Sequence, residues 1–145
     1  MKRKAILIGT DAGLVVYWVL TAVGIVSVGG GHMLSAWNWS FLPLDSLAAV
    51  LGLTWSLVPR GSRWSTPLLA AALALTHAAG LMAISFLALW GTWAAAWWIV
   101  NLWLTLMPVV VVLTALHRSW LGAAPRSREE LRLMPRCVRE VSRNT

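Results

Sequence analysis

Two aspartates lie within long apolar stretches of the chain. Asp11 lies inside the run from Ala5 to Val28, and Asp45 stands at the head of the run SLAAVLGLTWSLV. An ionised side chain at bilayer depth costs at least ~2.5–3.5 kcal/mol, so such a group faces other protein, finds a partner or stays protonated. Because neither stretch contains Lys or Arg, both positions favour a neutral acid that can donate a proton or a hydrogen bond. Asp45 and Asp11 are therefore the candidate catalytic residues.

Asp45 and Asn101 lie a similar number of residues into two apolar stretches, both counted from the same side of a membrane. With the helical rise of about 1.5 Å per residue, the two side chains are expected at a comparable depth in the outer half of the bilayer. One interpretation is an interhelical hydrogen bond that holds two helices together. The other is an outward-facing cavity in which Asp45 donates protons or binds a cation. For Asp11, the structural alternative is an acid that complements the positive end of a helix dipole.

His77 lies between small residues in the segment ALTHAAG, near the middle of its apolar stretch. This setting favours close helix packing with the imidazole bonded to a neighbouring helix. A metal site would need further His, Cys or carboxylate ligands at the same depth. The chain has a single cysteine, Cys137, in its polar tail. We therefore expect no metal and no cofactor.

Tryptophan is unusually frequent, with eleven Trp against one Tyr. Interfacial aromatic belts account for most of them, because indole rings favour the headgroup level. The dense outer group can also line the mouth of a site for a lipophilic or isoprenoid ligand. The candidate ligand-binding residues are Asn38, Asn101, His77, Trp39, Trp97 and Trp98.

The elements that carry these residues are predicted to be membrane-spanning helices. Hydrophobic residues make up 59% of the chain and charged residues 12%, against roughly half and a quarter in soluble domains. One span needs about 20 apolar residues. The expected spans are residues 5–28, 41–58, 67–90 and 95–116. The predicted fold is all-α, a four-helix transmembrane bundle with up-down topology.

The basic residues predict the orientation of that bundle. Every Lys and Arg lies before the first span, in the loop 59–66 or after the fourth span, and the loops 29–40 and 91–94 have none. This positive-inside pattern places both termini in the cytoplasm. The net charge of +7 is confined to those segments, which argues against nucleic-acid binding. Residues 1–116 form the predicted transmembrane domain. The basic tail 117–145 either binds anionic lipid headgroups or is simply solvated.

Five motifs resemble the YvaD-like family of small bacterial membrane proteins. The shared segments are TD at 10–11, YW at 17–18, AWNWSFLPLD at 36–45, GLMAISF at 80–86 and WWIVNLWLTLMP at 97–108. The resemblance implies a four-span protein of the bacterial cytoplasmic membrane, with Asp11, Asn38, Asp45 and Asn101 in the shared pattern. It implies no activity. The short glycine-rich first loop and the long arginine tail depart from the family.

Three functions of different classes fit these observations. The first is a non-enzymatic membrane protein that binds a lipophilic molecule or a membrane partner through an outward-facing site lined by polar residues and tryptophan. The second is a membrane-embedded acid catalyst acting on a lipid or isoprenoid, analogous to small terpene cyclases. The third is a small proton-coupled transporter, which would need a homo-oligomer to enclose a path.

Overall fold

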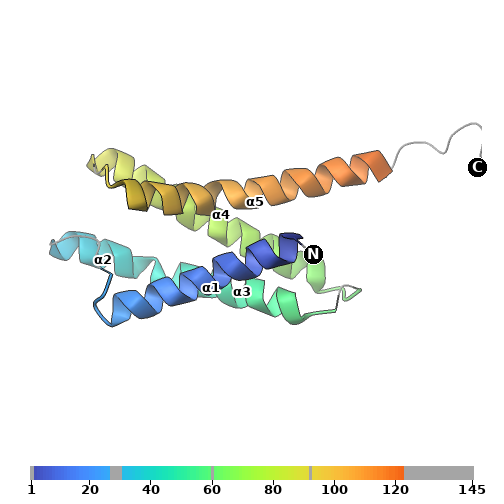
Figure 1. Cartoon of the computed structure of the whole chain (residues 1–145), viewed down its shortest axis with the longest axis horizontal. Coiled ribbons are helices and arrows are strands. Elements are labelled where there is room, and N and C mark those ends of the chain that lie inside the picture. The colour runs from blue at the N-terminus through green and yellow to red at the C-terminus, as the bar shows by residue number, and fades with distance from the viewer. Residues whose placement is uncertain (1, 27–30, 60, 92, 123–145) are drawn as a thin grey trace, which may run out of the picture. The chain divides into compact units, whose positions relative to one another are not determined.

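The computed structural model describes residues 2–26, 31–59, 61–91 and 93–122, and these residues form α-helices joined by short connections (Figure 1). The chain divides into two units, residues 1–112 and 113–145. All contacts described below lie within the first unit, and the last helix continues beyond it. The helices are α1 (Lys2–Ala22), α2 (His32–Ser40), α3 (Leu42–Leu57), α4 (Ser65–Trp90) and α5 (Ala95–Gly122).

Four segments are long and apolar enough to cross a bilayer. They are Lys4–Ala22, His32–Leu57, Ser65–Trp90 and Ala95–Trp120. The second segment consists of α2 and α3 together. The predictions of an all-α fold and of a four-helix membrane protein are confirmed.

The first helix ends earlier than the sequence suggested. We expected helix up to Val28, closed by the glycines at 29–31, but α1 ends at Ala22. Gly24 adopts a left-handed φ of 77°. The Gly24 N–H bonds the Thr21 carbonyl at 3.1 Å, and the Ile25 N–H bonds the Leu20 carbonyl at 2.9 Å. These two bonds form a Schellman motif, which satisfies the last carbonyls and stops the helix.

A helix also forms where a loop was expected. Residues 32–40 were assigned to the outer loop, but α2 covers them and α3 follows after Phe41 alone. Pro43 lies in the first turn of α3, as predicted, because a proline is tolerated there. A first-turn proline, however, does not prevent another helix from ending just before it. The connection places Trp37 and Asn38 on a helix rather than in a loop.

Helices α1 and α3 pack antiparallel through two reciprocal contacts. The Trp18 indole of α1 bonds the Asp45 carboxylate of α3 at 3.0 Å. Seven residues earlier on α1, the Asp11 carboxylate lies against Gly52, which is seven residues later than Asp45 on α3. A spacing of seven is about two helical turns, so both contacts lie on one face of each helix.

Helices α4 and α5 approach closely around Gly80. A Cβ atom built on Gly80 would lie 2.6 Å from Thr105 Oγ1 and 2.7 Å from the Thr105 backbone nitrogen. His77 Nδ1 lies 2.8 Å from the Thr105 carbonyl oxygen. Small residues allow this kind of backbone approach between membrane helices.

Two groups of buried side chains form the core. One contains Leu7, Leu73, Met107 and Val111, with Trp55 and Leu69 packed against it. The other contains Trp18, Phe41, Ala79 and Ala83, with Tyr17, Trp37, Leu42 and Leu44 against it. The second group borders the cavity described next.

Candidate functional site

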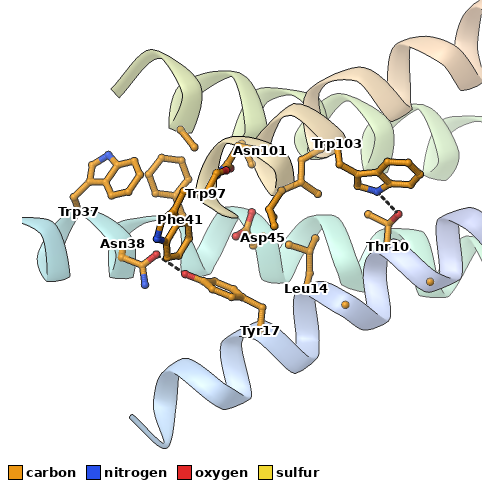
Figure 2. Close-up of a pocket in the computed structure, with 16 residues that line it drawn as sticks. Thr10, Leu14, Tyr17, Trp37, Asn38, Phe41, Asp45, Trp97, Asn101 and Trp103 are labelled. Carbon is orange, nitrogen blue, oxygen red and sulfur yellow. Dashed lines mark hydrogen bonds between the residues drawn. The ribbon is translucent and has the colours of Figure 1, made fainter. Parts of the chain in front are cut away.

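A cavity of about 330 Å³ lies mainly between α1 and α5. Figure 2 shows its polar and aromatic walls, with Asp45 and Asn101 both in view. From α1 it is lined by Gly9, Thr10, Gly13, Leu14 and Tyr17, and from α5 by Trp97, Val100, Asn101, Trp103 and Leu104. The remaining walls are Trp37, Asn38, Phe41, Asp45, Ala79 and Ala83. Its volume falls in the range of about 300–1,000 Å³ that is typical of small-molecule pockets.

Asp45 is the only carboxylic acid among the residues that line this cavity. Its side chain is buried, at 7% exposure, and Oδ2 accepts the hydrogen bond of the Trp18 indole. An indole N–H is a donor only, so Asp45 is the acceptor in this bond, and Oδ2 is the oxygen that it uses. Among the described residues, the other oxygen has no hydrogen-bond partner and stays available to a group in the cavity.

Asn38 enters the cavity from α2. The Tyr17 hydroxyl donates a hydrogen bond of 2.7 Å to Asn38 Oδ1, as the dashed line in Figure 2 shows. Asn38 is buried, at 5% exposure, and its amide NH₂ has no partner among the described side chains. Asn38 therefore lines the same cavity as Asp45, with its amide oriented by Tyr17.

Asn101 contributes from α5. Its Nδ2 donates to the Trp97 carbonyl one turn earlier, at 2.8 Å. The hydrogen bond between Asp45 and Asn101 that the sequence suggested as a structural alternative is not formed, because each residue has a different partner. The two side chains instead border one cavity, together with Asn38 and Trp97.

The other three predicted ligand-binding residues lie outside the cavity lining. Trp39 is 42% exposed and packs against Trp18 with ring centroids 5.7 Å apart. Trp98 stacks on Trp93 at 5.0 Å. His77 joins α4 to α5 through Thr105, which matches its expected packing role. Within the described residues, no cluster of His, Cys, Asp and Glu could hold a metal ion.

Asp11 also lies apart from the cavity. It is buried against α3, and its Oδ2 has no hydrogen-bond partner within the described part of the chain. Helix α1 begins at Lys2, so Asp11 lies more than two turns inside it. The effect of a helix dipole is confined to the first turn. The dipole therefore does not explain this residue.

Several residues that line the cavity or orient its polar side chains were not predicted from the sequence. Tyr17 orients Asn38, Trp18 orients Asp45, and the Trp103 indole bonds Thr10 Oγ1 at 3.1 Å across α5 and α1. One available signal was the position of Tyr17, the chain's only tyrosine, in the middle of an apolar run. A buried tyrosine hydroxyl needs a partner, and such a partner marks a polar site.

The cavity has an exposed rim midway along α1 and α5. Gly9 and Gly13 are both exposed cavity residues, and a Cβ on either would meet no atom within 4 Å. On α5, Val100 is 50% and Trp103 52% exposed. This part of each helix lies within a segment that is long and apolar enough to cross a bilayer.

Comparison with known proteins assigns the chain to a family. A family model described as "Family of unknown function (DUF5360)" matches residues 3–120. The chain is 31% identical over 116 residues to "Uncharacterized protein YvaD" of Bacillus subtilis (strain 168), covering 75% of this chain and 87% of that protein. No solved structure matches the chain. The resemblance inferred from the five motifs is thereby confirmed, and the chain belongs to the family of unknown function DUF5360.

Proposed function

We propose that this membrane protein binds a lipophilic molecule in the cavity between α1 and α5. The observation that carries the proposal is a cavity of about 330 Å³ whose largely apolar wall contains Asp45, Asn38 and Asn101. Ligand sites usually combine an apolar lining with a few polar groups that fix orientation. Here the polar groups come from three different helices and converge on one space.

The shape of the site supports a ligand that enters from the membrane. The α1 residues of the wall run from Gly9 to Tyr17, which is about 12 Å along the helix axis at 1.5 Å per residue. The exposed glycines 9 and 13 form the rim on that side. A molecule with an apolar body and one polar end can therefore pass from the acyl-chain region into the cavity with its polar end toward Asp45.

Photoaffinity labelling with a hexadecanol that carries a diazirine on its chain tests this proposal. The purified protein is irradiated in lipid nanodiscs, and the labelled residues are identified by mass spectrometry. We expect saturable labelling at cavity residues such as Tyr17 and Leu104. Gly13→Leu, which fills the cavity, should reduce that labelling at least about tenfold, since a filled site excludes the chain.

Ala12→Leu is the matched control, because Ala12 is the exposed neighbour of Gly13 on the same helix. It adds similar bulk on a face that does not line the cavity and should leave the labelling unchanged. Labelling spread evenly over lipid-facing residues such as Val15 and Val16, with no effect of Gly13→Leu, would contradict the proposal.

A second candidate function is acid catalysis on a neutral isoprenoid. It is favoured by the position of Asp45 as the one carboxyl group at an aromatic-lined cavity. Protonation of an alkene would transfer the Asp45 proton to carbon and leave a carbocation, which neighbouring aromatic rings can stabilise. Incubation with squalene followed by product analysis tests this function. Cyclised product from the natural protein and none from Asp45→Asn is the expected result, whereas no product from either excludes the reaction for that substrate.

The proposed setting of this site is the bacterial cytoplasmic membrane, with both termini in the cytoplasm. Support comes from the distribution of Lys and Arg, which leaves the two loops on the other side uncharged. The expected binding of anionic headgroups concerns the tail 117–145, of which residues 123–145, including Cys137, lie outside the described residues. We also propose that copies of this chain associate into a homo-oligomer in that membrane.

A further inference from the structure

Building on the proposed function, we propose that the cavity selects lipophilic ammonium compounds, whose cationic end pairs with Asp45 among aromatic side chains. This proposal specifies the charge of the ligand as well as its hydrophobicity. The ligand is a monovalent amine or quaternary ammonium with an apolar body. Anionic and uncharged molecules of the same shape are expected to bind more weakly.

The charges around the cavity argue against an anionic ligand. No Lys or Arg occurs between Lys4 and Arg60, or between Arg63 and Arg118. The cavity wall therefore contains no cationic side chain, and Asp45 is its single ionisable acid. A phosphate or carboxylate in this space would face the Asp45 carboxyl without any compensating positive charge, at low dielectric. A ligand cation would instead supply the partner that Asp45 lacks.

The aromatic residues of the wall fit the same ligand. Tyr17, Trp37, Phe41, Trp97 and Trp103 all line the cavity. Figure 2 shows the first four on the side of Asn38, and Trp103 beside Thr10. Tyr17 and Trp97 hold each other in an edge-to-face pair with centroids 5.8 Å apart. Aromatic rings attract cations through their quadrupoles, and cages of such rings recognise quaternary ammonium groups. A carboxylate combined with several rings therefore favours ammonium over a compact inorganic cation.

The hydrogen bond from Trp18 prepares Asp45 for this role. The indole occupies Oδ2 from the α1 side, so the carboxyl group cannot rotate freely. Because the indole has no acceptor, it does not compete for the ligand's positive charge. The second oxygen of Asp45 is the one left for the ligand. A protonated tertiary amine can donate its N–H there, and a quaternary ammonium can approach as an ion pair.

Two isosteric compounds provide the test: benzyltrimethylammonium and its uncharged carbon analogue, neopentylbenzene. Binding of each is measured by isothermal titration calorimetry on the full chain in an uncharged detergent, with empty micelles as the blank. We expect the ammonium compound to bind at least about tenfold more tightly, because a desolvated cation–π contact and an ion pair together exceed the energy of a tenfold ratio. In Asp45→Asn, whose amide oxygen can still accept the Trp18 bond, this preference should fall, because the ion pair is lost while the aromatic contacts remain.

Asp11→Asn is the matched control, since it removes the other membrane-embedded carboxyl group, which does not line the cavity. It should bind the ammonium compound as the natural protein does. If Asp45→Asn fails to fold, Trp97→Leu serves instead and should weaken ammonium binding more than binding of the neutral analogue. Equal binding of both compounds, or ammonium binding unchanged in Asp45→Asn, overturns the inference.

If hexadecanol labelling still depends on Gly13 in that case, the proposed function stands. If neither compound's binding nor the labelling responds to Gly13→Leu, both proposals fail.

Discussion

At the scale of single residues, the two membrane-embedded aspartates have different surroundings. Asp45 has an indole partner and an open cavity beside it. Asp11 has one oxygen without a partner and lies against a glycine. The sequence predicted that both would be buried and that Asp45 would share a level with Asn101. It did not reveal their partners, because those depend on which face of α1 meets α3. A uniformly apolar helix gives little indication of that face.

The Trp18–Asp45 hydrogen bond should contribute measurably to stability. Trp18→Phe keeps an aromatic ring but removes the donor, leaving Asp45 Oδ2 buried without its partner. Such a loss typically costs about 1–3 kcal/mol. The free energy of unfolding, measured by titrating SDS into mixed micelles, should fall by that amount. Trp39→Phe is the control, since Trp39 is exposed and its indole has no hydrogen bond to any residue that the structure describes. An equal loss in both variants would show that ring size, rather than the bond, matters.

Because Asp11 lies against Gly52, the stability cost of a substitution at Gly52 should depend on which residue stands at position 11. A methyl group on Gly52 would overlap the Asp11 carboxylate, so Gly52→Ala should destabilise the protein by about 1–3 kcal/mol, as overpacking does. In an Asp11→Ala background the same substitution should cost much less. Thermal unfolding of the four proteins forms a double-mutant cycle. Strictly additive effects would contradict the contact.

At the scale of helices, the sequence correctly predicted the helix ends that neighbouring residues determine. Helix α4 ends at Trp90 and α5 begins at Ala95, both as expected, and Gly91 with its left-handed φ of 73° terminates α4. The predicted end of α1 was too late, because Gly24 rather than the glycines at 29–31 provides the left-handed residue that terminates the helix. Helix α2 was missed because the second span was predicted only from the apolar run that begins at Phe41, which left residues 32–40 in the preceding loop.

The close packing of α4 on α5 should be sensitive to one methyl group. In Gly80→Ala, the new Cβ would meet the backbone of Thr105 and the Asn101 carbonyl, neither of which can move without shifting a helix. We expect a lower thermal unfolding midpoint and a loss of about 1–3 kcal/mol. Gly13→Ala is the control. Its Cβ meets nothing within 4 Å, and alanine is the better helix former by roughly 0.5–1 kcal/mol. Destabilisation of equal size in both would contradict the close approach.

At the scale of the whole molecule, composition and span length were sufficient to predict an all-α membrane protein. The cavity was not predictable as a shape, because it depends on which face of α1 the small residues at 9 and 13 occupy beside α5. Its polar groups were partly predictable: Asp45, Asn38, Asn101 and Trp97 line it, whereas Trp39, Trp98 and His77 do not. Residues near the expected outer interface share a depth, but depth does not determine which way a side chain points.

The orientation inferred from charge can be measured with single cysteines. In a Cys137→Ala background, Ser35→Cys lies before α3, and Gly61→Cys lies between the two arginines of the opposite connection. A membrane-impermeant maleimide should label Ser35→Cys in intact cells and Gly61→Cys only after permeabilisation, because basic loops stay in the cytoplasm. The reverse pattern would contradict the assigned orientation. Labelling of both in intact cells would contradict the up-down topology.

The central claim is that the cavity between α1 and α5 holds a lipophilic guest. Native mass spectrometry of the protein purified from membranes tests it most directly, with Gly13→Leu and Ala12→Leu prepared in parallel. We expect a co-purifying small molecule bound one to one by the natural protein and by Ala12→Leu, and its loss from Gly13→Leu. A protein that carries no bound molecule, or one that all three forms retain equally, would contradict it.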